Sequence, residues 1–266
     1  MTSGYHATDR ALLRVSGPEA REFLQGLVTN DVRRLDAGPV YAALLSPQGK
    51  YLFDFLMLSD TDGNSGGEGV LLDVKADRAA ALAQRLAVYR LRARVAIEPD
   101  GRAVVLGEGE PPAGALPDPR DPGLGWRAYP ADGPGFLAGM APLDPAAHAA
   151  RRVALGVPET GVELRPDDSY ILEMGFERLH GVDFRKGCYV GQEVTARMKH
   201  KTELRKGLVA VRVEGAAPPP GTEIFAGGKP AGTLFSVADG RGLAHLRFDR
   251  AEGELVAGDA RLVRAG

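Results

Sequence analysis

The sequence contains a single cysteine, and this scarcity excludes several kinds of protein. One thiol permits no disulfide within the chain. A conventional iron-sulfur cluster uses four thiolates or a mixture with histidine, so this chain cannot hold one alone. Histidines are also few and show no HxxxH or HExxH spacing, so we expect no resident metal site. They are His6, His148, His180, His200 and His245.

Charge of one sign and long apolar runs are missing as well. A net charge of -2 and a pI near 6.2 give no global attraction to polyanions. No apolar run approaches the roughly 20 residues that span a bilayer, and Asp54 and Asp73 interrupt the longest strand-like segments. The start, MTSGYHATDRALLRV, lacks the basic and apolar stretches of a signal peptide. We therefore expect a cytoplasmic protein without membrane contact.

The sequence also lacks the glycine motifs of nucleotide-binding proteins. A P-loop needs GxxxxGK[ST], and a dinucleotide fold needs GxGxxG between a strand and a helix. The Gly-rich run at 63–69 lacks the lysine and the following helix. Nucleotide binding by either route is not expected.

What is present predicts a folded protein with mixed helices and strands. At 266 residues, with 44% hydrophobic and 26% charged residues, the chain is long enough for two or three compact units. Strands and helices alternate without a strict βαβ order, which favours an α+β fold with largely antiparallel sheets. The expected elements are a strand at 11–15, a helix at 18–28, a hairpin at 40–58 turning at Pro47-Gln48-Gly49, and a helix at 77–89.

The C-terminal part has a different pattern. A Pro- and Gly-rich loop at 108–125 and a helix at 144–155 precede it. From residue 204, five short apolar strands separated by turn residues predict a small β-barrel or sandwich. We therefore divide the chain into an N-terminal α+β part at 1–110, a second part at 111–203, and a β-barrel at 204–266.

Cys188 is the first candidate for chemistry because of its setting in KGCYVGQE, residues 186–193. A lone cysteine is often a small buried apolar residue. Here, however, Lys186 supplies a nearby cation that favours the reactive thiolate. Cys188 and Lys186 are therefore the predicted catalytic residues. The motif also contains Gly187, Tyr189, Gly191, Gln192 and Glu193, which add flexible backbone, an aromatic face, an amide and a carboxylate.

A basic run at 185–206 overlaps the motif and extends beyond it. Such a run is either a solvated helix face or a site for phosphate, carboxylate or RNA. Its acidic members are only Glu193 and Glu203. The basic members are Arg185, Lys186, Arg197, Lys199, His200, Lys201, Arg205 and Lys206.

Four segments resemble one known family. They are FLQGLVTNDV at 23–32, LLSPQGKYLFDF at 44–55, GVDFRKGCYVGQEVTARMKHK at 181–201, and GLAHLRF at 242–248. In this order they resemble the YgfZ-like folate-binding proteins of iron-sulfur cluster assembly. The resemblance implies the fold of the glycine-cleavage aminomethyltransferase (T-protein), with helices and sheets around a central folate cavity and a C-terminal barrel.

The resemblance also implies a ligand, partners and a role. Tetrahydrofolate or a one-carbon derivative is the implied cofactor, and iron-sulfur client or assembly proteins are implied partners, with an indirect link to tRNA-modifying enzymes. Cys188 then acts as a transient cluster ligand, a redox thiol or a nucleophile. The residues implied to face the cavity are Gln25, Thr29, Asn30, Asp31, Gln48, Lys50, Asp54, Tyr189, Gln192 and Glu193.

Two further functions stay open. T-proteins carry an acidic pair where this chain reads Phe53-Asp54, and RLEAG where it reads Arg152-Val153-Ala154-Leu155-Gly156, so folate-dependent aminomethyl transfer is only partly matched. An RNA-binding module linked to tRNA modification would use the basic run. Taken singly, Asp31 also reads as a helix-end residue and Gln48-Gly49 as a plain hairpin turn.

Overall fold

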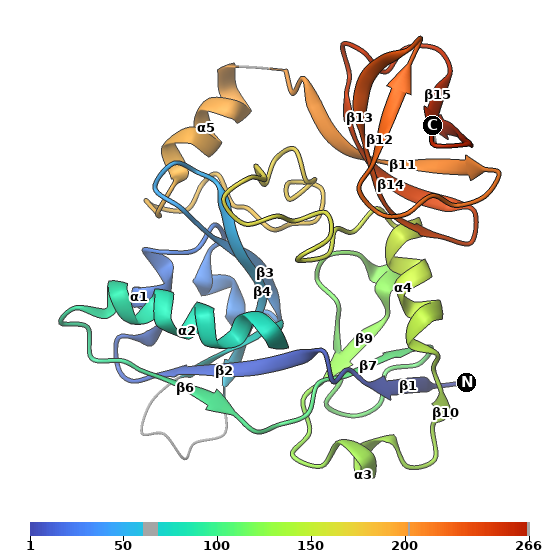
Figure 1. The fold of residues 1–266 in the computed structure, drawn as a ribbon. Helices are drawn as coiled ribbons and strands as arrows, with labels where there is room; N and C mark the ends of the chain where they lie inside the picture. The colour runs from blue at the N-terminus through green and yellow to red at the C-terminus, as the bar shows by residue number, and fades with distance from the viewer. Residues whose placement is uncertain (61–68, 202, 265–266) are drawn as a thin grey trace.

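The computed structural model describes residues 1–60, 69–201 and 203–264. In this described part the chain forms two five-stranded sheets and a closed barrel (Figure 1). The Gly-rich run at 63–69 lies, except for Gly69, outside the described residues. No helix within the described residues is long and apolar enough to cross a membrane.

The central sheet has the strand order β3-β4-β5-β2-β6 and is antiparallel throughout. The predicted hairpin is confirmed, since β3 and β4 pair through the turn at 46–50. The expected strand at 11–15 is confirmed within β2. The strands of the central sheet are β2 (Arg10–Ser16), β3 (Val40–Leu45), β4 (Tyr51–Asp60), β5 (Gly69–Lys75) and β6 (Ala96–Asp100).

Both faces of this sheet are buried, and the alternation of side chains along β3 explains how. Ala42 and Leu44 pack into the core beneath the helices, whereas Tyr41, Ala43 and Leu45 pack into a second core on the opposite face. The period of two along a strand produces this division. Every residue of β3 is accordingly buried.

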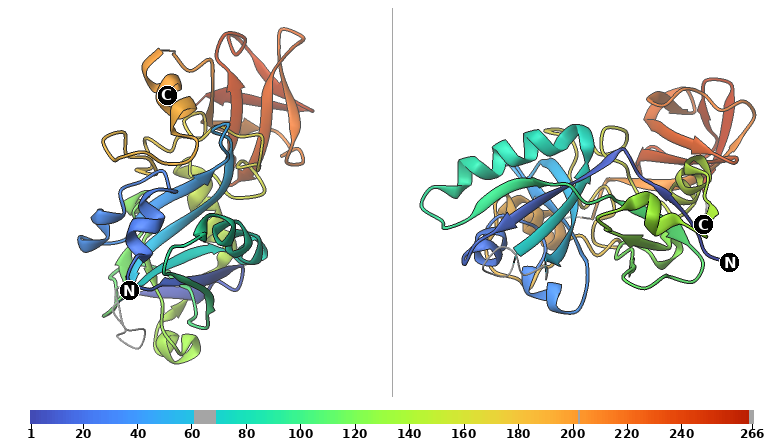
Figure 2. Two further views of the ribbon diagram at one scale, coloured as in Figure 1. Left: turned by 90° about the vertical axis from the view of Figure 1, so that its left-hand side faces the viewer. Right: turned by 90° about the horizontal axis from the view of Figure 1, so that it is seen from below.

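Two helices cover the first face. α2 (Ala76–Arg90) lies along β2, β5 and β6 (Figure 2), close to the predicted 77–89. α1 (Ala20–Gln25) is shorter than the predicted 18–28 because the chain leaves the helix at Gly26. Leu27 and Val28 still enter the core, but from the connection that leads to the 3-10 helix η1 (Val32–Asp36).

The second face is covered by a long segment without regular structure, residues 155–191. Its apolar side chains, including Phe176, Leu179 and Tyr189, form the second core with Tyr41 and Leu45. The rings of Tyr41 and Phe176 stack with centroids 4.8 Å apart. The KGCYVGQE motif is the end of this segment, so the sheet itself fixes its position.

The other sheet has the order β10-β1-β7-β9-β8, and only its β1–β10 pair is parallel. Residues 3–6 thus join strands from 105–142, so the chain start packs with the second predicted part. The division at 110 stays a prediction. The elements here are β1 (Ser3–His6), β7 (Val105–Glu108), β8 (Leu116–Pro117), η2 (Pro122–Leu124), β9 (Trp126–Ala128), α3 (Gly133–Leu137), β10 (Ala141–Pro142) and α4 (Pro145–Ala154), which confirms the helix at 144–155.

The C-terminal residues form a closed antiparallel barrel in the order β11-β14-β13-β12-β15-β16. The pairing of β11 with β16 closes it. β16 escaped the sequence analysis because it is a short strand in which two of the five residues, Arg261 and Arg264, are charged. α5 (Gln192–Lys201) precedes the barrel. The strands of the barrel are β11 (Lys206–Glu214), β12 (Thr222–Ala226), β13 (Lys229–Ala238), β14 (Arg241–Arg247), β15 (Leu255–Ala257) and β16 (Ala260–Arg264).

Candidate functional site

Cys188 lies exposed in the loop that ends at α5. A small buried apolar role for this residue is thereby ruled out. An exposed thiol is open to a partner molecule, which any of the three proposed roles of the cysteine requires. Within the described ranges, no three His, Cys, Asp or Glu side chains gather as a metal site, so Cys188 stands without other protein ligands beside it.

Lys186 is buried, and its ammonium holds the Cys188 loop onto the end of α1. Its Nζ donates hydrogen bonds to the carbonyl oxygens of Gln25, Val28 and Asn30 at 2.5 to 3.0 Å. Gln25 is the last residue of α1, and Val28 and Asn30 lie in the connection that follows it. Burial lowers the pKa of Lys186 to about 8, although the negative charges of Asp31 and Asp183 act to raise it. Lys186 is therefore an anchor for the loop; its predicted catalytic role stays a prediction.

Thr29 and Asn30 fasten the same segment to strand β3. The hydroxyl of Thr29 donates to the carbonyl of Gly181 and accepts the backbone N–H of Ala43. The amide of Asn30 donates to the carbonyls of Tyr41 and His180 at 2.7 and 2.6 Å. Both side chains are buried, and these bonds satisfy most of their polar atoms. Thr29 and Asn30 therefore hold the segment that precedes the Cys188 loop in place.

The hairpin turn and the motif touch at two glycines. Gly49 in the turn and Gly191 in the motif both have positive φ, +74° and +80°. A Cβ on Gly191 would lie 2.5 Å from the carbonyl oxygen of Ser46 and 3.0 Å from the Cα of Gly49. Only glycine permits this approach without strain. The hairpin segment at 44–55 and the motif segment at 181–201, which both resemble the same family, therefore pack against each other.

The other motif residues are divided between the inside and the surface. Tyr189 is buried, its backbone N–H donates to Gln192 Oε1 at 3.2 Å, and burial raises the pKa of its phenol to about 12. Glu193 is exposed and pairs with Arg197 one helical turn later. Gln192 thus closes the turn into α5, and Glu193 faces solvent.

The remaining predicted residues near this loop make local structural contacts. Asp31 caps η1 by accepting the backbone N–H of Arg33, and the Arg33 guanidinium lowers the pKa of its carboxyl group. Gln25 accepts the N–H of Val32. Gln48 is exposed in the hairpin turn. Lys50 donates to the carbonyl of Asp168 and lies 3.7 Å from the centroid of the Tyr170 ring.

Asp54 lies in the middle of the molecule, apart from the residues that hold the Cys188 loop in place. The hydroxyls of Tyr41, Tyr51 and Thr160 all donate to its carboxylate, which is 6% exposed. Three donors leave little acceptor capacity for a ligand. The Asp54 carboxylate is therefore held by protein hydroxyls, and its predicted role in cofactor binding stays a prediction.

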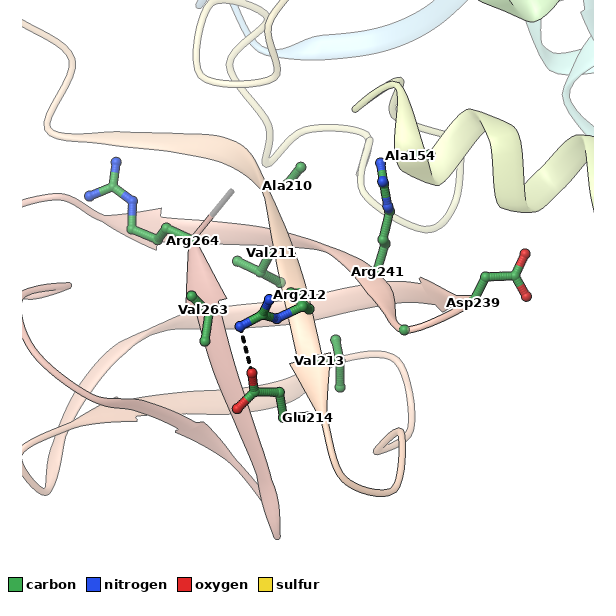
Figure 3. A pocket seen from close by; sticks show the side chains of 11 residues that line it. Ala154, Ala210, Val211, Arg212, Val213, Glu214, Asp239, Arg241, Val263 and Arg264 are labelled. Carbon is green, nitrogen blue, oxygen red and sulfur yellow. Dashed lines mark hydrogen bonds and ion pairs between the residues drawn. The ribbon is translucent and has the colours of Figure 1, made fainter. Parts of the chain in front are cut away.

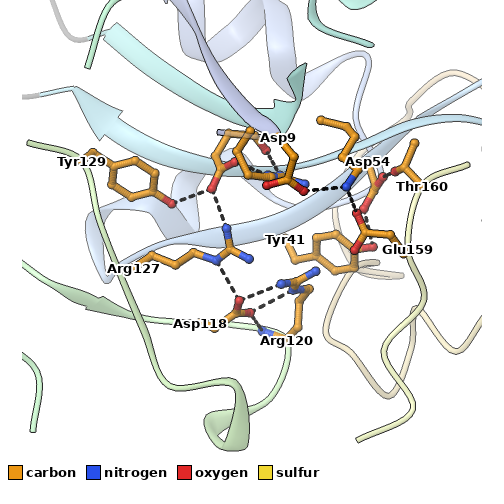
Figure 4. Close-up of polar contacts among 12 residues, drawn as sticks. Asp9, Tyr41, Asp54, Asp118, Arg120, Arg127, Tyr129, Glu159 and Thr160 are labelled. Atoms are coloured by element: carbon orange, nitrogen blue, oxygen red, sulfur yellow. Dashed lines mark hydrogen bonds and ion pairs between the residues drawn. The ribbon is translucent and has the colours of Figure 1, made fainter. Parts of the chain in front are cut away.

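Beside Asp54 lies a buried ion-pair network that the sequence analysis missed (Figure 4). Asp73 accepts from Arg10 and Arg127, and Asp118 accepts from Arg127 and Arg120, all at 2.7 to 2.9 Å. All five side chains are at most 11% exposed. Asp73 was visible as a charge inside the apolar run VLLDV, but nothing in the sequence indicated its partners.

Two of the residues implied for one folate cavity, Asn30 and Lys50, border separate pockets. Asn30 lines a pocket of about 430 Å³ together with Arg34, Tyr41 and His180. Lys50 lines a second pocket, and Asp54 lines neither. The first is large enough for a cofactor, since ligand pockets span roughly 300–1,000 Å³.

The barrel carries a further pocket, of about 750 Å³, between β11, the start of β14 and the end of β16 (Figure 3). Three arginines line it, Arg212, Arg241 and Arg264, and Arg212 pairs with Glu214. None of the predicted site residues lines it. The chemistry predicted from the sequence is therefore not located here.

His148 on α4 gives the protein an expected sensitivity to acid. Burial lowers its pKa from 6.5 to about 4, and Arg127 and Arg120 add repulsion. Between these pH values the unfolded chain binds a proton at this residue that the folded protein does not. The free energy of unfolding should therefore fall by about 3 kcal/mol as the pH falls through this window. We expect His148→Gln to remove this part of the loss, measured by urea unfolding near pH 6.5 and pH 4.

His200→Gln is the matched control, because His200 is exposed on α5. It should show the wild-type difference between the two pH values. If His148→Gln and His200→Gln lose stability equally in acid, burial of His148 does not cause the effect.

Comparison with known proteins gives relatives named as iron-sulfur cluster assembly factors. The Homo sapiens protein "Iron-sulfur cluster assembly factor IBA57, mitochondrial" is 34% identical over 277 residues, covering 92% of this chain and 78% of that protein. The Mus musculus protein of the same name is 31% identical, with the same coverages. The Neurospora crassa homolog is 34% identical over 79% of this chain, which spans only 54% of that protein. Residues 205–265 match the family described as the CAF17 C-terminal beta-barrel domain.

A solved structure confirms the expected fold. Glycine cleavage system aminomethyltransferase T from Bartonella henselae superposes with a TM-score of 0.79 over 99% of this chain and 84% of that one. At 16% identity this likeness concerns the fold alone. The predicted α+β, aminomethyltransferase-like architecture with a C-terminal barrel is therefore correct.

Two expectations change with these relatives. The predicted cytoplasmic location is contradicted, because the relatives are named as mitochondrial proteins. A secretory signal is only one kind of targeting segment, so its absence did not justify that inference. The relatives bear the IBA57 name, so the narrower YgfZ label stays a prediction.

Proposed function

Because this chain belongs to the IBA57 family of iron-sulfur cluster assembly factors, we propose that it assists cluster assembly on client proteins through the thiol of Cys188. Cys188 is exposed, and the buried Lys186 holds its loop in place. Both observations support this proposal. Loss of the thiol proton would give a thiolate, which binds iron.

One cysteine also defines what the partner must bring. A cluster needs about four ligands, mostly thiolates, and the chain offers one thiol. An iron-sulfur carrier or client must therefore supply the others. A redox role would likewise require a thiol from outside the chain, since the sequence has no second cysteine to form a disulfide. We favour the role of transient cluster ligand because it needs only an exposed thiol held in place.

Replacing Cys188 with serine tests this role. In cells that lack their own homologous factor, the wild-type chain should restore the activity of iron-sulfur enzymes, and Cys188→Ser should restore little. The purified variant should keep the wild-type melting temperature, because Cys188 is exposed. Full rescue by Cys188→Ser would exclude the thiol from the function.

Folate binding is a second candidate, supported by the pocket at Asn30. This pocket offers the half-exposed guanidinium of Arg34, which suits the carboxylates of a folate tail. Calorimetry with tetrahydrofolate should show binding that Arg34→Ala weakens and Asp54→Asn does not, provided both variants remain folded. Loss of binding in Asp54→Asn alone would instead place the ligand in the centre of the molecule.

Aminomethyl transfer and RNA binding have less support. Aminomethyl transfer needs a general base near folate, whereas the Asp54 carboxylate is already bound by three hydroxyls. An RNA-binding module would use the basic run, yet Arg197 and Lys199 pair with Glu193 and Glu177. The link to tRNA-modifying enzymes stays a prediction without structural support.

A further inference from the structure

The C-terminal end of α2 and the connection that follows it concentrate positive charge. Residues 78–97 contain five arginines and no acidic residue, in a chain whose net charge is -2. The end of α2 and its connection to β6 lie at the edge of the molecule, on the side away from the barrel (Figures 1 and 2). The exposed residues at this edge, which we call the α2 tip, are Arg85, Val88, Arg90, Leu91 and Arg92.

The arginines of the α2 tip have no carboxylate partner in the described part of the chain. Arg85, Arg90 and Arg92 are exposed, and none of them forms an ion pair with a described carboxylate. Arg94, just beyond the tip, is by contrast paired with Glu19 at 2.7 Å. The charges of the three tip arginines are therefore available to a partner outside the chain.

The nearest acidic residues along the chain lie apart from the tip. Asp77 is in the first turn of α2. At a rise of 1.5 Å per residue it lies about 20 Å from Arg90, which is beyond the screening length of about 8 Å at physiological ionic strength. Glu98 lies on β6, directly opposite Arg14 of β2. Neither residue cancels the charge at the end of the helix.

Two large apolar side chains are exposed among these arginines. Val88 is 66% exposed and Leu91 is 89% exposed. Within the described residues, the other exposed large apolar side chains are Met1 and Val256 alone. Residues three apart on a helix share a face, so Val88 lies beside Arg85. The α2 tip therefore combines aliphatic and cationic side chains on one exposed surface.

Leu91 ends the helix in a backbone conformation that leucine avoids. Its φ is +40°, in the left-handed region where glycine or asparagine commonly ends a helix. The Cβ of leucine makes this conformation unfavourable. Because the side chain is so exposed, packing within the described chain does not offset the strain. A strained residue without such a contact indicates a contact outside the chain.

From these observations we propose that the α2 tip binds the surface of an anionic lipid bilayer. Anionic headgroups attract arginines that lie close to the membrane surface, and guanidiniums bind the lipid phosphates. Leucine and valine side chains enter the boundary between headgroups and acyl chains. The absence of a bilayer-spanning run, on which the expectation of no membrane contact rested, does not bear on a contact at the bilayer surface. This site is independent of the function proposed for Cys188.

The tip suits a nucleic acid or a protein partner less well. A nucleic acid would leave Val88 and Leu91 without apolar partners, because its bases stack mainly on aromatic side chains. A stable protein interface buries about 800 Å² on each side and is usually centred on aromatic anchors, and the tip contains no aromatic residue. A bilayer surface accommodates aliphatic side chains and arginines together.

Vesicle flotation with the full chain tests the proposal. The probes are vesicles of phosphatidylcholine alone and vesicles of equal parts phosphatidylcholine and phosphatidylglycerol. We expect the protein to float with the anionic vesicles only, and the bound fraction to fall as salt screens the arginines. Equal binding to both kinds of vesicle, or binding to neither, overturns the proposal. Binding of tRNA that requires the tip arginines, without flotation, overturns it in favour of a nucleic-acid contact.

Three variants locate the contact. Leu91→Asn removes the apolar side chain at a position where asparagine tolerates the backbone, so it should weaken anionic vesicle binding about tenfold and keep the melting temperature. Arg90→Gln combined with Arg92→Gln should weaken binding about 25-fold, at about fivefold per arginine. Arg241→Gln combined with Arg250→Gln removes the same charge from exposed barrel positions and should keep wild-type binding. Equal binding by all three variants overturns the assignment to the α2 tip.

Discussion

Replacing Asp73 with asparagine should lower the free energy of unfolding by about 3–5 kcal/mol, because it leaves two buried guanidiniums without their shared carboxylate. Asp73 is completely buried and accepts from Arg10, Arg127 and Tyr129. Burial by itself would raise the pKa of its carboxyl group, but Arg10 and Arg127 hold that pKa below its usual value. The side chain is therefore charged at neutral pH, and urea unfolding at pH 7 measures its contribution.

Asp249→Asn provides the control for this prediction. Asp249 pairs with Arg247, and both side chains are well exposed, at 49% and 37%. Exposed ion pairs contribute little to stability because solvent screens them, so this variant should unfold almost like the wild type. If Asp73→Asn proves as mild as Asp249→Asn, then the network does not stabilise the fold as described.

Replacing Gly191 with alanine should lower the free energy of unfolding by about 2–4 kcal/mol and impair cluster assembly as well. The left-handed backbone at Gly191 is strained for alanine, and the new Cβ would press on the carbonyl oxygen of Ser46. Relief requires the motif to move away from the hairpin turn, which displaces Cys188. Thermal unfolding measures the first effect, and rescue of iron-sulfur enzymes in cells measures the second.

Gly187→Ala tests whether the loss comes from the contact of Gly191 with the hairpin turn or from any side chain added to a glycine of the motif. Gly187 is only one residue from Cys188, yet an added Cβ there meets nothing within 4 Å, and its φ lies outside the left-handed region. The change should alter stability by no more than about 0.5 kcal/mol and leave rescue intact. Equal loss in both variants would show that the motif tolerates no side chain at either glycine.

The exposure of Cys188 was partly predictable, whereas the contacts of Lys186 were not. The KGCYVGQE spacing indicated an accessible cysteine in a turn, and the structure places it on the surface. The ammonium of Lys186 binds carbonyls about 160 residues earlier in the chain, and its predicted action on the thiol stays a prediction. Sequence proximity gives the nearest cation along the backbone, and only packing decides where a long side chain ends.

By itself, the sequence determined the elements whose periodicity is local: the hairpin of β3 and β4, helices α2 and α4, and most of the barrel strands. It also determined that a single thiol is available and that a cluster needs ligands from elsewhere. Only the tertiary structure decided that Asp54 is enclosed by hydroxyls and that Asp73 and Asp118 share Arg127. Those arrangements depend on contacts between distant segments, and a charge inside an apolar strand shows that it needs a partner without showing which one.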